Sequence, residues 1–230
     1  MAEVSSTGID RLAQANVLVV GDVLLDRFVE GRVSRVSPEA PVPVLKYGAA
    51  RARLGGAGNV AANLVTYGAA ASLVGLTGDD EAAGELAALC AELPGLDAPL
   101  VRDRSRPTTV KTRYLGGWLQ LLRVDAEENH PMAADIAAAI IDVARQAMST
   151  AGAIVLSDYG KGVLDATTIA ALIGLAREAN LPVIVDPKKA TAEIFAGASL
   201  VTPNTEEMAQ FTGIRAETCL LYTSPSPRDS

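Results

Sequence analysis

Four polar turns, each placed directly after a short apolar run, carry most of the side chains that could do chemistry. The turns are Gly21-Asp22, 157–162, Asp186-Pro187-Lys188 and 203–207. Carboxylates and amides bind hydroxyl groups, lysines bind phosphate as point charges, and Mg²⁺ takes oxygen ligands while keeping several waters. Because ligands of open α/β sheets bind beyond the carboxyl ends of the strands, we expect the turns to form one site. Asp26, which follows Asp22 by four residues, is a weaker candidate for the same site.

Each of these residues also has a structural explanation. Asp22 could cap a turn, and acids in a first helical turn are favoured by the helix dipole whatever else they do. The roles that stay open are helix capping for Asp158 and Asn204, solvation for Lys161 and Lys188, and dipole stabilisation for Glu206 and Glu207. Their common placement after strands is what favours a site over a set of unrelated caps.

A glycine-rich stretch, Gly55-Gly56-Ala57-Gly58-Asn59, directly precedes a run with helical character. Glycine lets backbone N–H groups approach a ligand, and a helix N-terminus adds partial positive charge. The spacing matches neither a dinucleotide-binding turn nor a P-loop. Two interpretations stay open: a cradle for a polyol, a phosphate or a nucleotide, or a tight turn with close helix–strand packing.

The elements that must position these groups alternate between strand and helix. Expected strands are 16–20, 71–76, 98–101, 153–156, 181–185 and 199–202, and expected helices are 57–67, 81–92, 135–148, 166–179 and 205–211. This order predicts an α/β fold, a mostly parallel sheet with helices on both faces. Two β-like excursions, about 28–47 and 107–125, predict a small second sheet, the latter excursion being a hairpin that turns at 115–117.

Composition narrows the function classes. The 230 residues are 49% hydrophobic and carry a net charge of −7. The negative net charge argues against nucleic acid as a partner. The single histidine, His130, argues against a histidine metal site or a Ser-His-Asp triad. Cys90 and Cys219 lie far apart and are expected to be reduced thiols. Without a long apolar run or a signal-peptide pattern, we expect a cytoplasmic protein that does not enter membranes.

Seven segments together resemble the PfkB/ribokinase family of carbohydrate kinases, and within it the heptose 7-phosphate kinases. They are 19–27, 34–44, 55–61, 73–78, 156–162, 186–188 and 202–207. The resemblance spans about residues 10–215 and implies a ribokinase-like three-layer sandwich with a β lid. The implied activity is ATP-dependent phosphorylation of O1 of D-glycero-D-manno-heptose 7-phosphate, a step toward ADP-heptose and lipopolysaccharide core.

The resemblance also implies roles for individual residues. Asp22, Gly55, Gly56 and Asn59 would bind the sugar, with the glycine pair as the lid hinge. Asp158, Lys161, Asp186 and Lys188 would line the substrate cleft. Asn204, Thr205, Glu206 and Glu207 would face the nucleotide, with Glu207 near Mg²⁺. ATP and Mg²⁺ are the implied cofactors, a sugar phosphate the implied substrate, and a homodimer through the lid the implied assembly.

One departure from the family pattern concerns catalysis. The family's catalytic aspartate lies in a Gly-Ala-Gly-Asp motif, which does not occur in this sequence. We therefore expect a truncated kinase domain over 10–217, with lid segments at about 28–47 and 107–125, that is inactive by itself. Residues 218–230 are rich in serine and proline and are expected to be disordered or non-native. The alternatives are another sugar kinase of this family and a non-catalytic sugar- or nucleotide-binding fragment.

Overall fold

The computed structural model describes residues 12–188 and 192–214. Its central sheet has six parallel strands in the order β12-β11-β10-β1-β4-β6. Their bounds are β1 Asn16–Gly21, β4 Ala70–Val74, β6 Leu96–Asp97, β10 Ala153–Ser157, β11 Val183–Asp186 and β12 Leu200–Val201. The predicted parallel sheet is confirmed.

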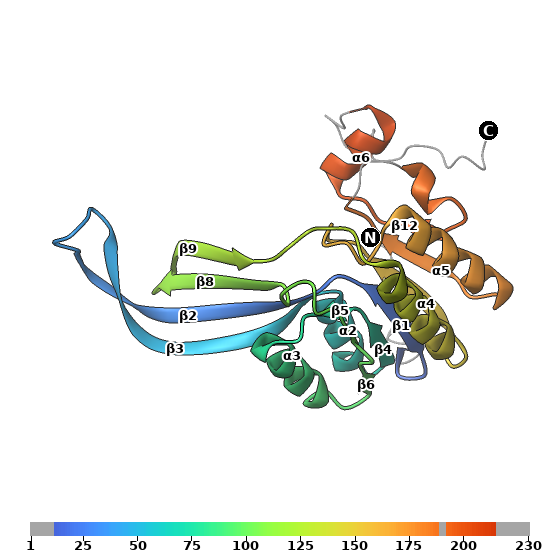
Figure 1. Ribbon diagram of the computed structural model, residues 1–230, viewed down its shortest axis with the longest axis horizontal. Coiled ribbons are helices and arrows are strands. Elements are labelled where there is room, and N and C mark those ends of the chain that lie inside the picture. Colours follow the sequence, from blue (N-terminus) through green and yellow to red (C-terminus); the bar gives the residue numbers. More distant parts are fainter. Residues whose placement is uncertain (1–11, 189–191, 215–230) are drawn as a thin grey trace, which may run out of the picture.

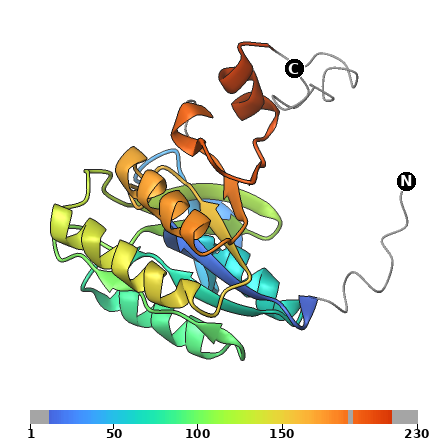
Figure 2. The same ribbon diagram turned by 90° about the vertical axis from the view of Figure 1, so that its right-hand side faces the viewer.

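Helices cover both faces of this sheet because successive residues of β1 point to opposite sides. Leu18 and Val20 pack against α4 (Ala134–Met148) and α5 (Ala166–Glu178), whereas Val17 and Val19 pack on the side of α2 (Ala57–Thr66) and α3 (Glu81–Ala91). Figure 2 shows the resulting three layers. A short 3-10 helix, η1 (Ala192–Phe195), and α6 (Thr205–Thr212) lie near the C-terminal end of the described residues.

A second sheet extends away from these layers, as Figure 1 shows. It contains β3 (Pro43–Gly56), β2 (Val23–Val36), β8 (Val110–Gly116) and β9 (Leu119–Ala126), in that spatial order. Strands β2 and β3 are antiparallel, as are β8 and β9, but β2 and β8 run parallel. The second sheet predicted from the two excursions is therefore present, and β2 and β3 extend beyond the predicted excursion of 28–47. We call it the lid sheet.

The boundaries differ from the sequence-based prediction most clearly at three places. Gly55 and Gly56 end strand β3 and pair with Leu24 and Val23, so they do not form a free loop. The hairpin turns at 117–118, since Gly116 still pairs with Leu119. The strand predicted at 98–101 is absent: β6 ends at Asp97, and β7 (Val101–Arg102) pairs with β5 (Leu76–Thr77). Pro99, which lacks a backbone N–H, lies between the two short strands.

Gly56 is required by geometry at the junction of β3 and α2. Its φ is 58°, and a Cβ there would lie 2.2 Å from the carbonyl oxygen of Asp22. A Cβ on Gly55 would lie 2.6 Å from a carboxylate oxygen of Asp26. The glycines therefore let the start of α2 approach the ends of β1 and β2, in agreement with the packing explanation of this stretch.

Two further expectations concern single features. Cys90 is a buried free thiol, and burial raises its pKa to about 11; Cys219 and the segment 218–230 lie outside the described residues. In the part of the chain that is described, none of the helices is long and apolar enough to cross a membrane.

Candidate active site

Within the described part of the chain, two clefts lie beyond the carboxyl ends of the central strands, and one residue, Tyr159, lines both. The first cleft, of about 370 Å³, lies between the lid sheet and the start of α2. It is lined by Leu24, Asp26, Phe28, Arg53, Leu54, Gly55, Gly56, Asn59, Lys111, Arg113, Arg123 and Tyr159. Three of the predicted sugar-binding residues, Gly55, Gly56 and Asn59, are thus together in it.

The first cleft is rich in positive charge. Four cationic side chains line it and come from three strands: Arg53, Lys111, Arg113 and Arg123. They share one face of the lid sheet because Asp26 is opposite Arg53 and Lys111 in the strand register, and Arg113 is opposite Arg123. Arg113 pairs with Asp26, and its guanidinium lies 5.4 Å from the centre of the Phe28 ring. Such a cleft suits a ligand that carries both hydroxyl groups and a phosphate.

The second cleft, of about 300 Å³, lies at the ends of β10, β11 and β12. Its lining residues are Asp158, Tyr159, Asp186, Pro187, Lys188, Thr202, Pro203, Asn204 and Glu207. The predicted residues Asp158, Asp186 and Lys188 therefore lie with Asn204 and Glu207, apart from the glycines. Asn204 caps α6, and its Oδ1 accepts N–H bonds from Glu206 and Glu207, each 2.9 Å long. Glu207 completes the capping box by accepting the Asn204 N–H at 2.8 Å.

Carboxylates repel one another in the second cleft. Burial, and then the charge of Glu207, raise the pKa of Asp186, while Lys188 acts in the opposite direction. The Lys188 ammonium lies 4.0 Å from Glu207, and its side chain is largely exposed. A divalent cation would relieve this repulsion. No group of three or more His, Cys, Asp or Glu suited to a metal occurs in 12–188 and 192–214. A carboxylate pair of this kind fits Mg²⁺ that keeps waters and phosphate oxygens as its other ligands.

The other predicted site residues lie outside both linings. Asp22 is buried, and its carboxylate accepts N–H bonds from Tyr159, Lys161 and Val163. The Lys161 ammonium donates to Glu127 at 2.7 Å. Burial would raise the pKa of Glu127, but hydrogen bonds from Lys161 and Lys111 outweigh burial and lower it. Thr205 and Glu206 lie on α6 beside the second cleft without lining it.

Sequence reasoning missed the four cations and Tyr159, and it preferred Asp22 to Asp26. A signal for the cations was available: Lys111 and Arg113 are two residues apart in a strand-like run, so they had to share a face. That the same face also receives Arg53 and Arg123 depends on strand register, which the run itself does not specify.

With this geometry established, known proteins offer a comparison. The family model described as pfkB family carbohydrate kinase matches residues 14–221. The chain belongs to this family. The bifunctional protein HldE of Azorhizobium caulinodans is 52% identical over 205 residues, which are 89% of this chain and 43% of that protein. HldE of Rhodospirillum rubrum is 45% identical over 203 residues, 88% of this chain and 41% of that protein. The chain thus spans less than half the length of these relatives.

Solved structures agree with the pfkB-family fold. Arabidopsis thaliana ribokinase complexed with ribose and ATP superposes with a TM-score of 0.61 at 20% identity, covering 90% of this chain and 64% of the ribokinase. The tetrameric inhibited form of phosphofructokinase-2 from Escherichia coli gives a TM-score of 0.66 at 17% identity. The match covers 89% of this chain and 66% of the phosphofructokinase. The expected ribokinase-like sandwich is confirmed.

Proposed function

We propose that this chain supplies the sugar-phosphate cleft and part of the nucleotide site of a kinase that transfers phosphate from ATP to O1 of D-glycero-D-manno-heptose 7-phosphate. The observation that carries the proposal is the first cleft, where Asp26 and Asn59 lie beside four cationic side chains. The carboxylate and the amide suit sugar hydroxyls, and the cations suit the 7-phosphate. The identity to HldE proteins favours a heptose over other sugars.

The second cleft is proposed to face the nucleotide phosphates. Asp186 and Glu207 would hold Mg²⁺, which shields phosphoryl charge during transfer. Lys188 would add a cation at the mouth of the cleft, and the amides at the start of α6 add partial positive charge. The lid sheet is proposed to cover the sugar and exclude water when both ligands are bound.

The acceptor hydroxyl needs a base. In the family that base belongs to the Gly-Ala-Gly-Asp motif, which this sequence lacks. We therefore propose that the 230-residue chain binds its ligands without turnover. ATP-dependent formation of heptose 1,7-bisphosphate by the purified chain would contradict this part of the proposal.

Calorimetry on the purified chain tests the substrate. We expect heptose 7-phosphate to bind at least about tenfold more tightly than the same heptose without its phosphate, because charge-assisted hydrogen bonds are the strong ones. Fructose 6-phosphate is the comparison sugar phosphate. Equal binding of heptose and heptose 7-phosphate would exclude the proposed phosphate role of the first cleft, and tighter binding of fructose 6-phosphate would favour another sugar kinase of the family.

We also propose that two copies associate through the lid sheet. Its side chains alternate, so the pairs Thr112–Val124 and Tyr114–Leu122 point away from the face that carries Arg113. Large apolar side chains are exposed on the lid sheet and its turns: Val33, Val36, Val42, Tyr47, Trp118, Leu119, Leu122 and Val124. Such a surface is typical of a protein interface. Sedimentation should show a dimer that Leu122→Glu converts to a monomer; a monomeric wild-type chain would exclude this association.

A further inference from the structure

The loop that joins β10 to α5 wraps around the carboxylate of Asp22. The Asp22 side chain accepts the backbone N–H groups of Tyr159 at 2.8 Å, Lys161 at 3.0 Å and Val163 at 3.0 Å. Asp22 is 1% exposed. Both carboxylate oxygens are thus engaged by loop residues at alternate positions, and the buried side chain offers almost no exposed surface to a sugar hydroxyl.

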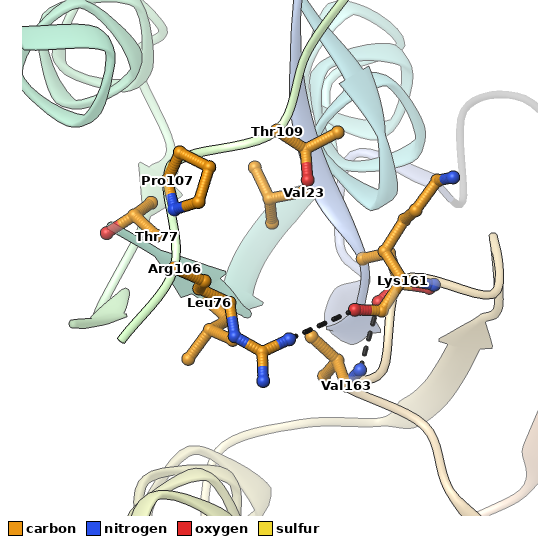
Figure 3. Close-up of a pocket in the computed structure, with 9 residues that line it drawn as sticks. Val23, Leu76, Thr77, Arg106, Pro107, Thr109, Lys161 and Val163 are labelled. Atoms are coloured by element: carbon orange, nitrogen blue, oxygen red, sulfur yellow. Dashed lines mark hydrogen bonds between the residues drawn. The ribbon is translucent and has the colours of Figure 1, made fainter. Parts of the chain in front are cut away.

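A second buried charge holds the same loop from another side. Arg106 donates to the carbonyl oxygens of Lys161 at 3.3 Å and His130 at 2.9 Å, and it pairs with Asp103 at 2.8 Å. Figure 3 shows the guanidinium of Arg106 pointing to the Lys161 carbonyl. Asp22, Arg106 and the loop residues Lys161 and Val163 line one small cavity, of about 10 Å³. Breaking such a buried charged contact is costly, so the loop has little freedom to shift.

The residue that this loop presents to solvent is Tyr159. It is the one residue common to the linings given for the two clefts. Burial, followed by the charges of Asp186 and Asp26, raises the pKa of its phenol. One of these carboxylates lines the second cleft and the other lines the first. A displacement of the loop would therefore change both clefts at once.

We propose that Asp22 is a positioning residue and not a sugar ligand: with Arg106 it fixes the loop so that Tyr159 forms a wall shared by the sugar phosphate and the nucleotide. This inference rests on the proposed function for the identity of the two ligands. It reassigns Asp22 and gives roles to Arg106 and Tyr159 that the sequence did not indicate.

The test compares Asp22→Asn with Asp26→Asn by calorimetry, using heptose 7-phosphate and ATP with Mg²⁺ as separate ligands. In Asp22→Asn the side-chain NH₂ group would face at least one backbone N–H of the loop and could not accept its hydrogen bond. We therefore expect this variant to lower the affinity for both ligands by a similar factor, about tenfold. Asp26→Asn should weaken the sugar phosphate alone. If Asp22→Asn weakened the sugar phosphate but not ATP with Mg²⁺, Asp22 would be a direct ligand of the sugar, and the inference would be overturned.

The same titrations distinguish a folding defect from a displaced loop. A purely structural defect lowers the fraction of competent protein, and hence the stoichiometry, while Kd of the folded molecules stays the same. A displaced loop changes Kd. If Asp22→Asn does not fold, Tyr159→Ala decides, because it removes the shared wall and leaves the Asp22 bonds to the backbone in place.

Tyr159→Ala should weaken both ligands about tenfold, and Tyr159→Phe, which keeps the ring, should restore most of the affinity. Tyr67→Ala, at an exposed tyrosine after α2, is the matched control and should change neither. Wild-type affinity in Tyr159→Ala would refute the inference. Failure of the wild-type chain to bind either ligand would instead refute the proposed function.

Discussion

The two clefts that share Tyr159 carry opposite charge. The lining of the first has four cations against one carboxylate: Arg53, Lys111, Arg113 and Arg123 against Asp26. Asp125, which is outside this lining, pairs with Lys111 and Arg123. The second has three carboxylates against one cation: Asp158, Asp186 and Glu207 against Lys188. Both ligands of the proposed reaction are phosphorylated. We therefore propose that the first cleft binds phosphate directly, whereas the second takes a metal cation between its carboxylates and the ligand.

The two clefts also arise differently from the chain. The cations of the first lie on strands of the lid sheet, where alternation and register collect them on one face. The acids of the second lie at the ends of central strands or in the first turn of α6. The first is thus built on a projecting sheet, and the second at the edge of the packed central sheet. Four experiments test the contrast between the two clefts.

Charge reversal in the first cleft should have the largest effect. Arg113→Glu places a second carboxylate beside Asp26, and like charges at a binding site cost several kcal/mol. We expect the affinity for heptose 7-phosphate to fall at least about 100-fold, with the affinity for Mg²⁺-ATP unchanged, as measured by calorimetry. Arg104→Glu, at a side chain that is 86% exposed and pairs with Asp79, is the control. An unchanged sugar-phosphate affinity in Arg113→Glu would contradict a phosphate-binding role.

Neutralising the second cleft should have a smaller, metal-dependent effect. Asp186→Asn removes one of the two proposed Mg²⁺ ligands, so we expect the gain in ATP affinity on adding Mg²⁺ to fall about tenfold. Without Mg²⁺, ATP should bind the variant at least as well as the wild type, because one repelling charge is gone. Asp142→Asn, at an exposed ion pair on α4, serves as the matched control. Equal Mg²⁺ dependence in the variant and the wild type would place the metal elsewhere.

Lowering the pH should affect ligand binding differently in the two clefts, because Asp186 lines the second one. Its folded-state pKa is raised by burial and by Glu207, so Mg²⁺-dependent ATP binding is present above that raised pKa and is lost as the pH falls through it. Stability changes in the opposite sense: the contribution of Asp186 is greatest below its unfolded pKa and decreases as the pH rises through the folded one. Asp186→Asn should remove this pH dependence of binding. Persistence of the same pH profile in the variant would assign the titration to another group.

Ionic strength should give the smallest difference. The cations of the first cleft act on phosphate directly and are partly exposed, so raising salt from about 0.05 M to about 0.5 M should weaken heptose 7-phosphate binding several-fold. Mg²⁺-ATP binding at saturating Mg²⁺ should change less. In the second cleft the metal ion would bind the phosphate oxygens, and Glu207, one of its two proposed ligands, is buried. Equal salt slopes for the two ligands would argue that the two clefts bind phosphate in the same way.

The sequence predicted the central sheet better than it predicted which residues line the two clefts. Apolar runs such as 16–20, each followed by a polar turn, predict where the strands lie along the chain, because the hydrophobic pattern of a strand is local. The capping role of Asn204 was available from its spacing to Glu207. The choice between Asp22 and Asp26 was not available. Asp22 lies between β1 and β2 and is covered by a loop 137 residues or more away, whereas Asp26 projects from β2 into the first cleft.

The sequence by itself determined the α/β class, the alternation of strand, turn and helix, the lid excursions and the polar turns at the strand ends. These follow from local periodicity and from the backbone needs of Gly and Pro. Only the tertiary structure decided that Arg113 meets Asp26 from 87 positions away, that four cations share one face, and that Tyr159 borders both clefts. Those outcomes depend on strand register and on loop hydrogen bonds between distant segments, and no short stretch of sequence encodes either one.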